Sequence, residues 1–208
     1  MTFILGLTGS IGMGKSTTAR MFTVHGVPVH DSDATVHKLY EGRAVPLVEA
    51  QFPGVSVDGK IDRKALSAKV LGNPEALKQL EAIVHPLVHE EEERFLADAR
   101  RRGALLVVID SPLLLETVTA KRCDAVLVVT APFEVQKARV LARPGMTEEA
   151  FERIHVKQMP DSEKRHRAHF IVDTGRGMEA AQRQVDDIVR ALAGRYGSIS
   201  RQISHNHH

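Results

Sequence analysis

The fold of this 208-residue chain is decided by the stretch Gly9-Ser-Ile-Gly-Met-Gly-Lys-Ser16. The apolar run before it, Phe3 to Leu7, is typical of a buried parallel strand. A helical pattern follows it and reaches about Val24. The spacing of glycines and lysine matches a phosphate-binding loop, the P-loop. A strand, this loop and a helix in that order predict an anion site at the first strand–helix junction, where ligands bind in such sheets.

Each residue type in the loop has a chemical reason. Gly12 and Gly14 can adopt backbone angles closed to other residues, so main-chain N–H groups approach phosphate oxygens closely. The helix that begins at Lys15 directs the positive end of its dipole at the same anion. Lys15 reaches the β- and γ-phosphates, and the Ser16 hydroxyl is a ligand for Mg²⁺. The predicted ATP-binding residues are Gly9, Gly12, Met13, Gly14, Lys15, Ser16 and Thr17.

Further along the chain, apolar runs alternate with helical patterns. The runs at Val27–His30, Leu105–Ile109, Ala125–Val129 and Phe170–Val172 are short, and most are rich in β-branched residues. Such runs are typical of parallel strands covered on both faces. The sequence therefore predicts a three-layer α/β fold of the P-loop NTPase and kinase type with a parallel sheet.

Between Gly59 and Gly103 the sequence shows helical spacing and no strand signal, with Pro86 expected to begin a new helix. We interpret this region as an all-helical insertion. An apolar stripe from Ala181 to Leu192 predicts the closing helix. The expected organisation is one domain over residues 1–196, with an insertion at about 59–103, a lid at about 143–167 and a flexible tail at 197–208.

Composition excludes several classes of protein. Hydrophobic residues make up 43% and charged residues 26%, and 28 Lys and Arg face 26 Asp and Glu. This balance gives no electrostatic case for binding nucleic acid or a membrane surface. No apolar stretch is long enough to span a bilayer. The single cysteine, Cys123, is expected to be a small packing residue, and the first residues lack a basic leader. We expect a cytoplasmic protein with no obligate protein partner.

Three further side chains could take part in chemistry at the loop. Asp110 ends a predicted strand, where an acid of the Walker-B type helps to hold Mg²⁺. Asp33 follows the second strand and can accept the proton of an acceptor hydroxyl or orient that hydroxyl. Its alternative role is to cap the helix that begins at Ala34. Arg143 precedes a Pro-Gly break and can close onto the transferring phosphoryl group, although a cation at a helix C-terminus is also favoured by the dipole.

The type of P-loop protein follows from what accompanies the loop. The chain lacks the Asp-x-x-Gly and Asn-Lys-x-Asp elements of a GTPase, and it has no Gly-Gly pair of the kind found in the signature loop of transporter ATPases. A kinase for small substrates needs an acid near the acceptor hydroxyl and cations on a lid. Asp33 supplies the acid, and Lys137, Arg139 and Arg143 are the candidate lid cations.

From Phe3 to about Leu192 the chain resembles the dephospho-CoA kinases, which catalyse the last step of coenzyme A biosynthesis. The resemblance implies transfer of the ATP γ-phosphoryl group to the ribose 3′-hydroxyl of dephospho-CoA. It also implies that Asp33 is the general base, that Thr8 and Arg143 lie around the reaction centre, and that the insertion contacts the acceptor. The elements that carry it are Leu7-Thr-Gly-Ser-Ile-Gly-Met-Gly-Lys-Ser-Thr17, Asp31-Ser-Asp33, Val84-His-Pro86, Asp110-Ser-Pro-Leu-Leu-Leu-Glu116, the Arg143 segment, Gln158-Met-Pro-Asp-Ser-Glu-Lys164 and Ile171-Val-Asp-Thr-Gly175.

The chain departs from the family pattern at Ser32, Leu115, Ala168-His169 and Thr174. The last two departures put a specific base-reading role near the final strand in doubt. Two other functions stay open: a kinase for nucleosides or nucleoside monophosphates, and a nucleotide-binding regulatory module without transferase activity.

Overall fold

The computed structural model describes the backbone of residues 1–205 and the side chains of residues 1–117 and 119–193. The chain divides into two compact units. The sheet unit consists of Met1–Val29 and the chain from Ala99 onward, and the inserted unit is His30–Asp98. The elements are β1 (Phe3–Thr8), α1 (Lys15–Val24), β2 (Val29–Asp31), α2 (Ser32–Leu39), α3 (Val45–Gln51), β3 (Ser56–Val57), β4 (Lys60–Ile61), α4 (Arg63–Val70), α5 (Pro74–Arg101), β5 (Leu106–Asp110), the 3₁₀ helix η1 (Val118–Arg122), β6 (Ala125–Thr130), α6 (Phe133–Leu141), α7 (Glu148–His155), α8 (Asp161–His166), β7 (Phe170–Asp173) and α9 (Met178–His205).

The main sheet has five strands in the order β2-β5-β1-β6-β7. Strand β1 pairs in parallel with β5 and with β6, and β6 pairs in parallel with β7. Because the carboxyl ends of parallel strands meet at one edge, Leu7 lies opposite Asp110, and Thr130 lies opposite Asp173. This confirms the predicted α/β class with a parallel sheet, and the strand bounds differ from the predicted ones by at most two residues.

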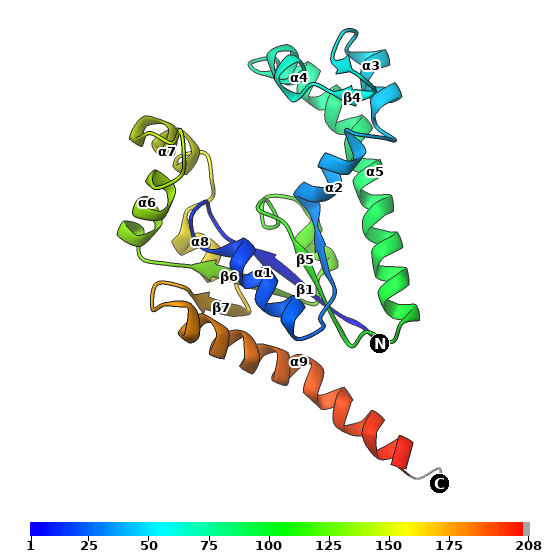
Figure 1. Cartoon of the computed structure of the whole chain (residues 1–208), viewed down its shortest axis with the longest axis vertical. Helices are drawn as coiled ribbons and strands as arrows, with labels where there is room; N and C mark the ends of the chain where they lie inside the picture. The colour runs from blue at the N-terminus through cyan, green and yellow to red at the C-terminus, as the bar shows by residue number, and fades with distance from the viewer. Residues whose placement is uncertain (206–208) are drawn as a thin grey trace. The chain divides into compact units, whose positions relative to one another are not determined.

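Alternation along the strands gives the sheet two buried faces. On one face, apolar side chains of four strands pack against α1 and α9, which lie side by side (Figure 1). On the other face, Val126 and Val128 pack with Leu114 and Cys123 from the segment that links β5 to β6. A Cβ at Gly6 would lie 2.9 Å from the Cys123 sulfur, so Cys123 is the packing residue that we expected. The apolar core between this first face and the two helices includes Leu5, Leu7, Ala19, Met21, Phe22, Leu106, Val108, Leu127, Val129, Val172, Ala181, Val185 and Ile188.

The inserted unit has its own apolar core, to which α2, α3, α4 and α5 contribute. Two expectations about this region were wrong. Pro86 lies inside one continuous helix, α5, instead of starting a new one. An interior proline costs about 3 kcal/mol, but the buried side chains Val84 and Leu87 on either side of it contribute about 1.5–3 kcal/mol each, so packing prevails. The region is also not purely helical, because β4 pairs with β3 as an antiparallel hairpin.

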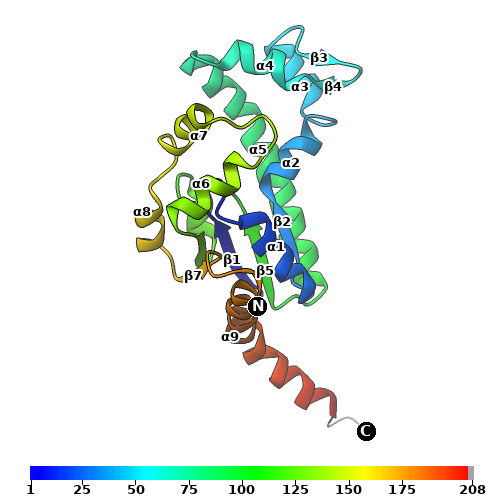
Figure 2. The ribbon, with the colours of Figure 1, turned by 60° about the vertical axis from the view of Figure 1, so that its left-hand side comes forward.

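Helix α9 extends to His205, beyond Gly197, where we expected a tail to begin; residues 206–208 lie outside the described part of the chain. In the sheet unit, α6 and α7 pack against each other (Figure 2). No helix within the described residues has the length and apolar character needed to cross a membrane.

Candidate active site

The glycine-rich loop joins β1 to α1 and leaves the start of that helix open. Gly14 is the N-cap of α1, with φ 94°, and no side chain caps the helix. A helix leaves its first N–H groups without intrahelical partners, and their partial positive charge attracts an anion. The loop and the first turn of α1 therefore form a site suited to phosphate.

The two central glycines are required by space as well as by backbone angle. Gly12 has φ 78°, and a Cβ there would lie 2.9 Å from the carbonyl oxygen of Gln136. A Cβ at Gly14 would lie 3.1 Å from Cγ2 of Thr174. Since both positions also have positive φ, any L side chain at either one would strain the loop.

Lys15 and Asp110 form the ion pair at the centre of this site. The Lys15 Nζ donates to the Asp110 Oδ1 at 2.5 Å. Asp110 ends β5 directly opposite Leu7 of β1, so sheet register brings the carboxylate to the loop. The Lys15 side chain is 16% exposed and that of Asp110 3% exposed. A buried carboxylate is stable only with such a partner, and the pair connects the predicted phosphate-binding cation to the predicted Mg²⁺ ligand.

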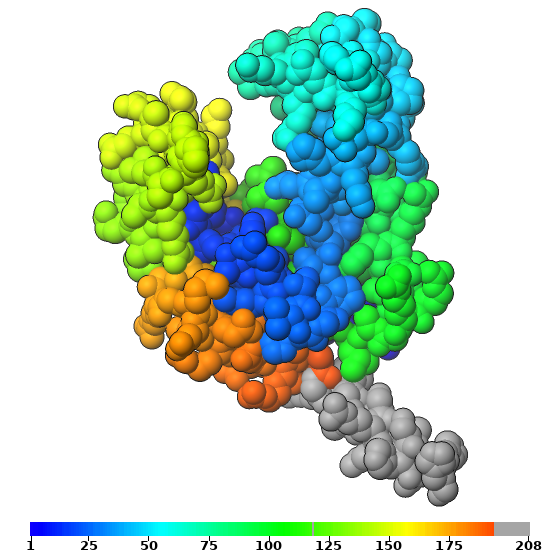
Figure 3. Space-filling model, viewed as in Figure 1, coloured from blue at the N-terminus to red at the C-terminus, as the bar shows by residue number. Residues whose placement is uncertain are grey.

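Hydrogen bonds from the surrounding elements fix the backbone of the loop. Gln158 Oε1 accepts from the Ile11 N–H at 3.0 Å, and Gln136 Nε2 donates to the Ile11 carbonyl at 2.8 Å. The Thr174 hydroxyl donates to the Met13 carbonyl at 2.7 Å. In the space-filling view the yellow-green atoms of α6 and α7 stand beside the blue atoms of the N-terminal segment (Figure 3). The loop is thus held in shape before any ligand arrives.

Two of the predicted lid cations have structural partners. The Arg139 guanidinium donates to the Thr174 hydroxyl at 2.8 Å and to the Thr174 carbonyl at 2.9 Å. Lys137 pairs with Glu148 at 3.0 Å, and this hydrogen bond raises the pKa of the lysine above its ordinary value. Arg139 therefore braces the segment after β7 against α6, and Lys137 connects α6 to α7.

Arg143 and Thr8 lie at two other points of the sheet unit. Arg143 follows α6, is exposed, and has no hydrogen-bond or ion-pair partner for its guanidinium among the described side chains. Gly145, with φ 75°, turns the chain just after it. Thr8 is fully buried at the end of β1, and its hydroxyl donates to the Pro112 carbonyl at 3.2 Å. Arg143 is thus a cation available to a ligand, whereas Thr8 has a partner within the protein.

A pocket of about 520 Å³ borders the loop in the sheet unit. Met13 belongs to both the loop and this pocket, and Met13 Sδ accepts from the Ala131 N–H at 3.1 Å. Asp161 in the same pocket accepts from the Thr130 hydroxyl at 2.9 Å. The lining residues are Met13, Thr130, Ala131, Pro132, Phe133, Gln136, His155, Pro160, Asp161, Ser162, Arg165 and Asp173.

The inserted unit carries Asp33 on its first helix, α2. The N-cap of α2 is Asp31, whose Oδ1 accepts from the Ala34 N–H at 2.9 Å. Asp33 lies in the first turn, is exposed, and has no polar partner among the described residues. The alternative role of Asp33 as the helix cap is therefore wrong, because Asp31 fills it.

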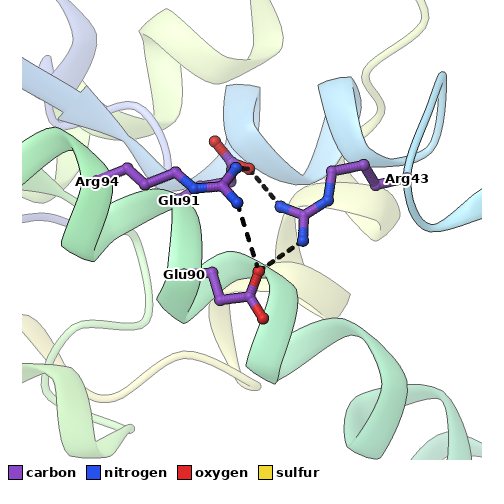
Figure 4. Close-up of polar contacts among 4 residues, drawn as sticks. All are labelled: Arg43, Glu90, Glu91 and Arg94. Carbon is purple, nitrogen blue, oxygen red and sulfur yellow. Dashed lines mark hydrogen bonds and ion pairs between the residues drawn. The ribbon is translucent and has the colours of Figure 1, made fainter.

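A second pocket, of about 570 Å³, lies wholly within the inserted unit, between α2 and α5. On its wall Arg43 pairs with Glu90 at 2.5 Å and with Glu91 at 2.7 Å, and Arg94 also pairs with Glu91 (Figure 4). The hydrogen bond from Arg43 lowers the pKa of Glu90 below its ordinary value. The lining residues are His30, Thr35, Lys38, Leu39, Gly42, Arg43, Glu91, Arg94 and Phe95.

Comparison with known proteins decides the family. The family model for dephospho-CoA kinase matches residues 3–179. The chain belongs to the dephospho-CoA kinase family. A dephospho-CoA kinase of Mesorhizobium japonicum is 60% identical over 195 residues, which cover 94% of this chain and 99% of the relative.

Solved structures share the fold of this chain. A crystal structure from Thermus thermophilus, 38% identical, has a TM-score of 0.80 and matches 91% of this chain and 97% of its own. Dephospho-CoA kinase from Campylobacter jejuni, 23% identical, has a TM-score of 0.64 over 92% of this chain and 97% of its own, and it supports the fold.

The structure brings together some of the site residues that the sequence predicted. Lys15 and Asp110 meet at the P-loop, while Asp33 belongs to the inserted unit. Sequence reasoning missed the residues that hold the loop backbone. Gln136 carries no local signal, because it lies in an ordinary helical pattern 125 positions from its partner Ile11. Thr174 belongs to the Ile171–Gly175 element of the resemblance and departs from the family pattern there, but the sequence predicts no contact between its hydroxyl and the loop.

The side chains at the P-loop fit the Mg²⁺ that the kinase family implies. The Ser16 hydroxyl is exposed at the start of α1, and the Asp110 carboxylate lies beside Lys15. Among the residues whose side chains are described, no three His, Cys, Asp or Glu gather into a metal cluster. Mg²⁺ is usually held by one or two carboxylates together with substrate phosphates and water, so this sparse donor set suits it.

Proposed function

We infer that this chain transfers the γ-phosphoryl group of ATP to the ribose 3′-hydroxyl of dephospho-CoA, giving coenzyme A and ADP. The observation that carries the proposal is the Lys15–Asp110 pair at an uncapped helix start, in a chain of which residues 3–179 match the family model. The 60% identity to a dephospho-CoA kinase over nearly the whole chain supports the acceptor.

The proposed reaction is an in-line displacement. The acceptor oxygen attacks the γ-phosphorus, the bond from that phosphorus to the leaving ADP oxygen breaks, and Asp33 accepts the hydroxyl proton. Lys15 and Arg143 stabilise the charge that spreads over the phosphoryl oxygens. The chemistry that Mg²⁺ supplies, when bound by Ser16 and Asp110, is neutralisation of phosphate charge. Residues 143–167 serve as the lid, and Thr8 lies near the acceptor.

The proposal also includes the cellular compartment and the binding partners of the enzyme. We propose that it acts in the cytoplasm on small molecules, with no nucleic acid, no membrane and no obligate protein partner. The near balance of 28 basic and 26 acidic residues supports the first two points.

A panel of acceptors tests the function. With ATP and Mg²⁺ present, we expect ADP release in a coupled assay to depend on dephospho-CoA and to stay at background with nucleosides and nucleoside monophosphates. Turnover with a nucleoside instead would make the chain a nucleoside kinase. ATP binding without ADP release for any acceptor would make it a regulatory module.

The pocket of the inserted unit is suited to an anionic part of the acceptor. Dephospho-CoA carries a diphosphate next to its ribose. On α2, Lys38 lies five residues after Asp33, a separation of about 7.5 Å along the axis at 1.5 Å per residue. Lys38 lines the pocket and has no ion-pair partner among the described side chains, unlike Arg43 and Arg94 on the same wall. We propose that Lys38 binds the acceptor diphosphate.

Replacing Lys38 tests this placement. For Lys38→Ala we expect the KM for dephospho-CoA to rise about 10-fold with the KM for ATP unchanged, because a charge-assisted hydrogen bond contributes about 1.5–3 kcal/mol. Steady-state kinetics with each substrate varied in turn measures this. Lys69→Ala, an exposed lysine on α4 of the same unit, is the matched control. Equal kinetics in the two variants would exclude Lys38 from acceptor binding.

A further inference from the structure

Lys164 on α8 is a lysine with no exposed surface. Lysine is almost never buried completely unless its charge is paired, because removing an ammonium group from water is costly. Its Nζ pairs with Glu116 Oε1 at 3.0 Å and donates to the Pro112 carbonyl at 3.3 Å. Both partners belong to the segment that directly follows Asp110, so α8 is tied to the loop at the carboxyl end of β5.

The Pro112 carbonyl has a second donor. The Thr8 hydroxyl also donates to it, at 3.2 Å, and Thr8 is the last residue of β1 before the P-loop. One residue earlier, the Ser111 N–H donates to the Leu7 carbonyl at 3.0 Å. Residues 111 and 112 therefore join the ends of β1 and β5. Lys164, on α8, donates to the same Pro112 carbonyl and so connects α8 to this junction.

A buried ion pair is weak support for stability. Replacing such a pair with apolar groups of similar size is often neutral or stabilising, because the desolvation cost disappears with the charges. Helix α8 packs against β6, and Val126 and Val128 of that strand belong to the buried apolar cluster of this face, so a methionine on α8 lies next to an apolar layer. What an apolar side chain cannot supply is a donor to the Pro112 carbonyl.

We propose that Lys164 is a positioning residue for phosphoryl transfer, which holds the Pro112 carbonyl and through it orients Thr8 beside the P-loop. This rests on the proposed kinase activity. Lys164 is not placed against the substrate; it acts through the Pro112 carbonyl, which also accepts from the Thr8 hydroxyl. The same contact connects α8, in the proposed lid, to the end of β1, which precedes the P-loop, and to the end of β5, which carries Asp110.

A double-mutant cycle on kcat tests the proposal. For Lys164→Met we expect kcat to fall about 10-fold with both KM values within threefold. If Lys164 acts through Thr8, then Thr8→Val should lower kcat in the unmodified enzyme but by less than twofold in the Lys164→Met background, because both changes then abolish the same effect, the orientation of the Thr8 hydroxyl. Lys121→Met, an exposed lysine in the sheet unit, should leave kcat unchanged.

Stability and activity are separated by a further variant. Lys164→Met could unfold because Glu116 loses its partner. In that case the double variant Lys164→Met/Glu116→Leu, which removes both charges, replaces Lys164→Met in the cycle. Two results would overturn the role of Lys164 and leave the proposed function standing, provided that the unmodified enzyme is active. One is that the effects of the Thr8 and Lys164 substitutions on kcat are additive, and the other is that Lys164→Met keeps kcat within twofold. An unmodified enzyme with no acceptor-dependent ADP release would overturn the proposed function and this role with it.

Discussion

Lys15→Ala is expected to lower kcat at least about 10³-fold. Removing one preorganised donor that stabilises the charge of a transition state lowers the rate about 10²–10³-fold. In this site a second effect adds to that loss. Without Lys15 the Asp110 carboxylate, only 3% exposed, loses the cation that pairs with it at 2.5 Å and brings its negative charge close to the incoming triphosphate. A coupled assay for ADP release, with ATP affinity measured separately, gives the turnover and the binding loss.

The companion variant distinguishes lost catalysis from lost folding. Lys15→Ala combined with Asp110→Asn removes both charges, so we expect thermal stability to recover relative to Lys15→Ala while turnover stays at background. Lys121→Ala, an exposed lysine of the sheet unit, controls for the loss of a positive charge. Turnover by Lys15→Ala within tenfold of the unmodified enzyme would contradict the role of Lys15 at the transferring phosphate.

Much of the phosphate site could be predicted because its signals are local. The β1 run, the glycine spacing and the helix from Lys15 are adjacent in the sequence, and each is dictated by backbone geometry within a few residues. Asp110 was predicted because it ends a strongly apolar run, and parallel pairing puts strand ends at one edge. Such features follow from periodicity and from the chemistry of phosphate alone.

The rest depended on contacts between distant segments. Gln136, Thr174 and Lys164 are ordinary residues in their local patterns, and only tertiary packing reveals that they fix the loops around the site. The helix through Pro86 was missed for a similar reason, since buried side chains on both sides outweigh the local cost of proline. The β3–β4 hairpin is different. Asp58 and Gly59, with φ 50° and 75°, form the two-residue turn that an Asp-Gly pair favours, so its signal was present in the sequence.

Asp33→Asn is expected to lower kcat about 100-fold while ATP affinity stays nearly unchanged. The amide has the size of the carboxylate and can still contact a hydroxyl, but it cannot accept the proton, and a positioned base contributes about 10²–10⁴ in rate. Asp33 is exposed in the first turn of α2 and has no polar partner among the described side chains, so the substitution removes no structural interaction. Pre-steady-state measurement of phosphoryl transfer reports the effect without a contribution from product release.

The neighbouring Asp31 provides a matched control. Asp31→Asn makes the same chemical change two residues away, and asparagine caps a helix about as well as aspartate, so the bond to the Ala34 N–H is retained. We expect this variant to keep kcat within about threefold and α2 to remain folded. If both variants lose activity to the same extent, the loss reflects the charge of the α2 start and Asp33 is not the base. If only Asp33→Asn lowers kcat, the Asp33 carboxylate accepts the acceptor proton, because the start of α2, the fold and the ATP site are the same in the two variants.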